Sequence, residues 1–195
     1  MTPPTPPPSN DAFNFITVFV SIILGLAVTE ILQGFKRLLI TRNRVQLYAP
    51  ALCWAFLTLI SLAQTWWAMF DLRRHDQWTF AMYAAVLLQT LFLYTTAALA
   101  LPDQPAGEEA AMRATYYEHA RPFFVLSAAA AMASILKELV LYGRLPEPAN
   151  MGFHLAFIIA TSVAAATRRP WYHQVLGPVA VGLYVIYSVM LFAVL

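Results

Sequence analysis

Six polar side chains lie within or at the ends of long apolar stretches, and these residues could do chemistry: Glu30, Gln33, Gln64, Lys137, Glu138 and His154. An ionisable side chain inside a membrane span is expensive, so it indicates a functional site by default. The chemistry of such groups in lipid is the binding of ions and the relay of protons. We treat the six as a candidate intramembrane polar site.

Glu30 stands toward the end of the first apolar stretch and is followed by Gln33 and Gly34. A carboxylate in this position can bind a cation or carry a proton. The competing interpretation places Glu30 at the level of the lipid headgroups, where it pairs with Lys36 or Arg37.

Lys137 and Glu138 lie toward the end of a later apolar stretch. Adjacent residues of a helix diverge by about 100°, so these two do not pair face to face. One interpretation is that Lys137 extends to the membrane surface. The other is an outer-leaflet polar site shared with Gln64 and His154. Gln89, in the middle of another stretch, is expected to hydrogen-bond a neighbouring helix.

Other kinds of active site have no support in the sequence. The apolar stretches hold no Ser/His/Asp set and no clustered zinc ligands. We therefore expect no enzyme activity, no catalytic centre, no metal site and no cofactor. A remote alternative is a b-type haem protein, which needs two histidines at equal depth on facing helices. The candidate pairs are His75 with His154 and His119 with His173.

The elements that must position these residues are membrane-spanning helices. Of 195 residues, 60% are hydrophobic and only 11% are charged, against roughly 25% charged residues in a soluble domain. So few charges cannot cover a water-facing surface. A clustered basic face of the kind that binds nucleic acid is also missing from the sequence.

A helix needs about 20 apolar residues to cross the hydrocarbon core. The sequence therefore predicts an all-α polytopic membrane protein, with one transmembrane domain over residues 13–195 that is a bundle of about six helices. The spans are expected at 13–39, 47–70, 78–101, 122–142, 151–167 and 171–195, of which the fifth is the shortest. Residues 1–12 are rich in proline and are expected to form a disordered tail.

Lysine and arginine are distributed unevenly over the loops. Loops one, three and five hold eight of them, whereas both termini and loops two and four together hold three. Because positive loops stay in the cytoplasm, we expect both termini on the outer side. Residues 108–121 of loop three either lie as an amphipathic helix on the inner membrane surface or extend the fourth span.

The fifth span carries a stripe of small residues at a spacing of four, which consists of Gly152, Ala156, Ala160 and Ala164. Small residues let helix backbones approach closely in lipid. We therefore expect this small-residue stripe to face a helix.

Two short segments have a distinctive composition. The first is Gly34–Phe35–Lys36–Arg37–Leu38, and the second is Tyr116–Tyr117–x–x–x–Arg121–x–Phe123–Phe124. Together they resemble segments of small multi-pass proteins of the bacterial inner membrane. The resemblance covers under a tenth of the chain and implies an inner (plasma) membrane location. It carries no known activity, so no functional residue transfers.

Two classes of function fit these observations. Translocation of a small solute or ion is favoured by the intramembrane polar residues and by a faint inverted repeat of three plus three spans, in which Trp78 and Tyr94 match Trp171 and Tyr187. The alternative, a non-transporting membrane partner or assembly subunit, is favoured by how apolar the spans are. The expected partners are the lipid bilayer and either a second copy of the chain or another membrane protein, but no nucleic acid.

Overall fold

The computed structural model describes residues 9–41, 46–73, 75, 77–102 and 112–192. The regular secondary structure within these ranges is helical, which confirms the all-α part of the predicted fold class. The helices are α1 (Ser9–Thr41), α2 (Ala49–Leu72), α3 (Phe80–Ala100), α4 (Met112–Tyr142), α5 (Pro148–Ala166) and α6 (Pro170–Phe192). Residues 1–8, most of the predicted tail, lie outside the described ranges.

Five helices, α1 to α5, are long and apolar enough to cross a membrane when the described residues are searched. They fit a multi-pass membrane protein. The α6 helix is not among the five that the described residues contain. The sixth span therefore stays a prediction, whereas the short fifth stretch qualifies.

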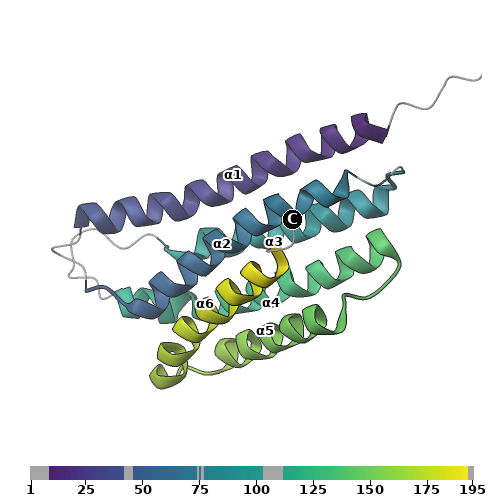
Figure 1. Cartoon of the computed structure of the whole chain (residues 1–195). Coiled ribbons are helices and arrows are strands. Elements are labelled where there is room, and N and C mark those ends of the chain that lie inside the picture. Colours follow the sequence, from purple (N-terminus) through teal and green to yellow (C-terminus); the bar gives the residue numbers. More distant parts are fainter. Residues whose placement is uncertain (1–8, 42–45, 74, 76, 103–111, 193–195) are drawn as a thin grey trace, which may run out of the picture.

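The helices lie side by side and alternate in direction (Figure 1). The α1 helix packs against α3 and α2, α3 packs against α4, α4 packs against α5, and α2 packs against α6. Between α5 and α6 there is little contact. The core is built from one face of each of the first four helices, with Val20, Ile31, Trp54, Leu62 and Phe124 among its fully buried side chains.

The segment ahead of the predicted fourth span is helical and continuous with it. The α4 helix runs from Met112 through Pro122 to Tyr142. Met112, Tyr116 and Ala120 are buried in the bundle. Of the two interpretations of this segment, the extension of the fourth span is therefore the one found over residues 112–121, because its apolar face packs against protein.

The two halves of the chain make different helix contacts. The α1 helix packs along α3, but α4 does not pack along α6. At one end of the second pair, the side chains of Tyr116 and Phe124 contact His173. A three-plus-three repeat would require the contacts of the first half to recur in the second, and they do not.

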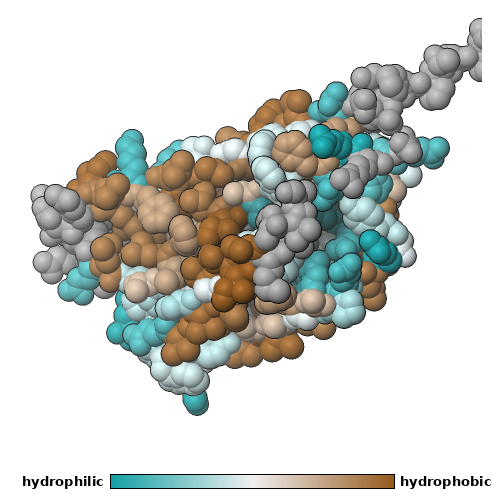
Figure 2. Space-filling model, viewed as in Figure 1, coloured by the Kyte–Doolittle hydropathy of each residue, from teal (hydrophilic) through white to brown (hydrophobic). Residues whose placement is uncertain are grey.

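Large hydrophobic side chains are exposed on every helix, among them Val18, Phe56, Phe80, Ile159 and Ile186. Figure 2 shows hydrophobic side chains over much of the middle of one face of the bundle. Extensive exposed apolar surface of this kind marks contact with a membrane or with another protein.

The small-residue stripe of α5 is covered only in its second half. Ala164 is buried and Ala160 is half-buried, whereas Ala156 and Gly152 are exposed. A methyl group added at Gly152 would meet no atom within 4 Å. Within the described chain, the expectation that the whole stripe faces a helix is therefore met only near Ala164.

Candidate functional site

A small cavity lies among α1, α2, α3 and α4, in the half of the bundle next to the α2–α3 loop. Its volume is about 10 Å³, which is roughly the room that one water molecule needs. Most of the lining is apolar, with Val20, Met69 and Val86 among its members. The polar lining residues are Thr65, Gln89, Thr90 and Lys137.

The two threonines of the lining use their hydroxyl protons within their own helices. Thr65 Oγ1 donates to the carbonyl of Ser61 across 2.8 Å, and Thr90 Oγ1 donates to the carbonyl of Val86 across 2.8 Å. Only lone pairs of the hydroxyl oxygens remain for the cavity. The N–H donors of the lining side chains are therefore the ammonium of Lys137 and the amide of the buried Gln89.

Lys137 is half-buried, and no hydrogen bond or ion pair of its ammonium is found among the described residues. Glu138, the next residue along α4, attracts the ammonium electrostatically but does not line the cavity. A charged group inside a membrane helix normally pairs with another group. The cavity is the place where a bound partner of the Lys137 ammonium would lie.

Of the residues predicted for an outer-leaflet site, the structure puts Lys137 in the cavity and leaves the others outside its lining. Gln64 directly precedes the lining residue Thr65 on α2. The side-chain oxygen of Gln64 is buried without a hydrogen-bond partner among the described residues. Nδ1–H of His154 donates to the carbonyl of Asn150 on its own helix across 2.9 Å. Asn150 in turn accepts from Tyr187 of α6 across 2.7 Å, so His154 belongs to the α5–α6 side.

Glu30 and Gln33 lie outside the cavity lining as well. Glu30 is half-buried on α1 and Gln33 is exposed. Next to them Gly34 is packed tightly against Leu101, at the end of the bundle opposite to Lys137. Arg37 donates to the carbonyl of Leu101 across 3.0 Å, which fixes the end of α1 to the end of α3.

That opposite end is filled by an inner aromatic cluster, which consists of Tyr48, Tyr116, Tyr117, Phe124 and His173. His173 is fully buried. Its Nε2–H donates to the carbonyl of Thr167 across 2.9 Å, so its Nδ1 accepts from the hydroxyl of Tyr116 across 2.9 Å. The hydroxyls of Tyr48 and Tyr117 lie 3.0 Å apart and share a further hydrogen bond.

Sequence reasoning missed this cluster. It considered His173 only as half of a haem pair, and Tyr116 as part of a segment that either lies on the membrane surface or extends the fourth span. The usable signal was the density of aromatic residues over 116–124, but the sequence does not reveal that α6 begins beside them.

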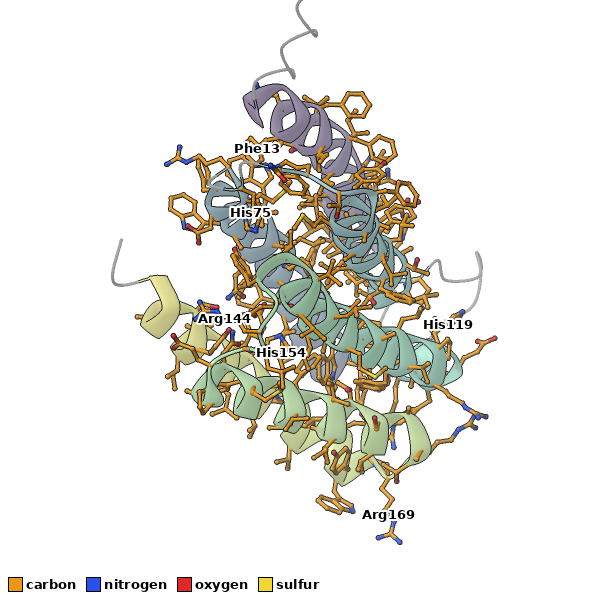
Figure 3. All side chains as sticks on the ribbon, turned by 90° about the vertical axis from the view of Figure 1, so that its right-hand side faces the viewer. Phe13, His75, His119, Arg144, His154 and Arg169 are labelled. Carbon is orange, nitrogen blue, oxygen red and sulfur yellow. The ribbon has the colours of Figure 1, made fainter. Side chains whose placement is uncertain are left out.

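The histidine pairs that b-type haem requires are not assembled in the described part of the chain. Both ring nitrogens of His173 are already bonded, and Nδ1–H of His119 donates to the carbonyl of Thr115 on its own helix. Figure 3 views the bundle from the end that carries His75 and Arg144, and there His75 and His154 lie apart. Likewise, the described residues contain no group of three or more histidine, cysteine or acidic side chains that could hold a metal.

In comparisons with known proteins, no family model, no curated protein and no solved structure matches this chain.

Proposed function

We propose that this chain is an inner-membrane protein that moves a small ion or solute across the bilayer. The observation that carries the proposal is Lys137, an ammonium without a hydrogen bond or ion pair in the described chain, at a small, partly polar cavity between four helices. Ionisable groups inside spans cluster on substrate and ion pathways because their cost is tolerated only where they serve a purpose.

The two halves of the bundle differ in a way that supports this proposal. The half with Lys137 holds the cavity, whereas the other half is closed by the inner aromatic cluster around the fully buried His173. Alternating access works by opening a central site to one side of the membrane at a time, and a bundle that is filled at one end is compatible with it. By the bias of lysine and arginine, the cavity half would face outward, with both termini on the same side.

The test is a flux measurement on the purified chain in liposomes. We expect ion- or solute-dependent flux in the wild type and its loss in Lys137→Gln. The matched control is Lys36→Gln, which removes an exposed lysine at the other end of the bundle. Equal flux in Lys137→Gln and the wild type, with both proteins folded, would contradict the assignment of Lys137.

A second candidate function is that of a membrane partner or assembly subunit. The observation that favours it is the exposed first half of the small-residue stripe, at Gly152 and Ala156. Such surfaces pair helices in lipid. Absence of flux for all solutes tested, together with loss of a co-purifying membrane protein in Ala156→Leu, would favour this function over translocation.

A further inference from the structure

The only charge among the residues that line the Lys137 cavity is positive, since the nearby carboxylate of Glu138 lies outside the lining. Lys137 is the only ionisable residue in the lining, and the lining contains no carboxylate. A cation placed there would be repelled by the ammonium at short range in a medium of low dielectric constant. The cavity therefore favours a species with negative charge or with free lone pairs.

The hydrogen-bonding groups of the lining lead to the same choice. The Lys137 ammonium has three N–H donors, and no described residue accepts from them. The amide of Gln89 adds further N–H donors from the neighbouring helix α3. The lone pairs of Thr65 and Thr90 face the cavity without protons to offer, since both hydroxyls donate to their own helices. A ligand that accepts hydrogen bonds would thus be bound by the N–H donors of Lys137 and Gln89.

The size of the cavity limits the ligand further. About 10 Å³ of volume is the least that one water molecule needs, so a chloride ion, which is somewhat larger than water, enters only when a flexible side chain such as that of Lys137 moves outward. Phosphate, sulfate, carboxylates, sugars and amino acids are too large. The apolar side chains of Val20, Met69 and Val86 complete the wall, and they strengthen electrostatic attraction by excluding water.

We infer that the cavity is a binding site for a small monatomic inorganic anion, of the halide class, held by the ammonium of Lys137 and the amide of Gln89. This inference rests on the proposed function and names the substrate class of the same site. A single bound water and a proton carried by Lys137 are the competing occupants.

Binding and transport are tested separately. Purified protein in detergent is heated in sodium chloride and in sodium gluconate at equal ionic strength, because a ligand that binds the folded state raises the melting temperature. We expect chloride to raise the Tm of the wild type and of Lys36→Gln, but not of Lys137→Gln. Loss of a charge-assisted hydrogen bond should weaken chloride binding about tenfold or more. Gln89→Leu should weaken it by a smaller factor, and Lys137→Arg should retain part of the shift, which separates charge from folding.

Liposome flux of chloride, potassium and protons is then measured on the same proteins. Chloride flux that requires Lys137 supports both proposals. A chloride-dependent Tm shift without any flux supports the anion site and overturns translocation. Flux of potassium or protons without an effect of chloride keeps translocation and overturns the anion site. No shift and no flux would overturn both.

Discussion

The hydroxyl of Tyr116 donates to Nδ1 of His173 across 2.9 Å, and this bond joins α4 to α6 where the two backbones do not pack along each other. Nε2–H of the same imidazole donates to Thr167 at the end of α5. One buried ring therefore connects three helices. Because both nitrogens are bonded, the neutral tautomer with its proton on Nε2 is the one that fits.

Tyr116→Phe is predicted to destabilise the bundle. The substitution leaves Nδ1 of His173 buried without a donor, and an unsatisfied buried polar group costs about 1–3 kcal/mol. Unfolding of the purified protein in a detergent series measures the loss. The control is Tyr94→Phe, because no hydrogen bond of the Tyr94 hydroxyl is found among the described residues. Equal losses in the two variants would contradict the role of the Tyr116–His173 bond.

Gly34→Ala is predicted to destabilise the contact between α1 and α3. A Cβ at Gly34 would lie 2.5 Å from Cβ of Leu101, an atom that cannot move away without its backbone. Overpacking of this kind costs about 1–3 kcal/mol. Gly25→Ala on the same helix meets nothing within 4 Å, so it should be neutral or gain up to about 1 kcal/mol of helix propensity.

The double variant Gly34→Ala, Leu101→Ala sharpens this test. Removing the leucine side chain beyond Cβ relieves only part of the clash, since Cβ of Leu101 itself is the nearest atom. We expect partial rescue in the same detergent series. Full tolerance of Gly34→Ala alone would show that the helices approach less closely.

The helices were largely predictable because the length and apolar content of a span are local properties of the sequence. The stretch 78–101, for example, became α3 at Phe80–Ala100. The extension of α4 ahead of Pro122 was left open between two interpretations. The burial of Met112 and Tyr116 against other helices decides between the two interpretations. A local sequence pattern does not reveal such burial.

The candidate site was predictable only in part for a related reason. Lys137 is conspicuous as a charge in an apolar stretch, so the sequence marks it. Which helices surround it depends on rotation and packing order, and these placed Gln89 and Thr90 at the cavity while His154 went to the α5–α6 side. The composition of a span determines neither the rotation of its helix nor the order in which the helices pack.

Ala164→Leu is predicted to destabilise the protein, because Ala164 is buried at 1% exposure where α5 meets the bundle. Added methylene groups in a packed interior cost about 1–3 kcal/mol. Ala156→Leu lies on the same small-residue stripe but is exposed, so the isolated chain should tolerate it. Thermal unfolding distinguishes the two, and equal destabilisation would mean that the stripe is covered along its whole length.

Glu30→Gln is predicted to leave flux through the Lys137 cavity unchanged. Glu30 is half-buried on α1 and does not line the cavity. The same liposome assay measures the effect, with Lys137→Gln as the variant that should abolish flux. If Glu30→Gln blocks flux while the protein stays folded, the carboxylate would be part of the pathway, as the first interpretation of the sequence held.

The threading of the chain is testable with two exposed arginines at opposite ends of the bundle. Arg144 lies in the α4–α5 loop, and Arg169 lies between α5 and α6. Both are labelled in Figure 3. The excess of lysine and arginine in loops one, three and five predicts that Arg144 is outside and Arg169 inside. Cys53, the single native cysteine, is first replaced by Ala, so that each new cysteine is alone.

A membrane-impermeant maleimide applied to intact cells should then label Arg144→Cys but not Arg169→Cys. After the membrane is permeabilised, both should react, which shows that each thiol is accessible. The reverse pattern in intact cells would invert the threading and turn the Lys137 cavity toward the cytoplasm. Labelling of both positions from outside would mean that α5 does not cross the membrane, because it is the helix that separates them.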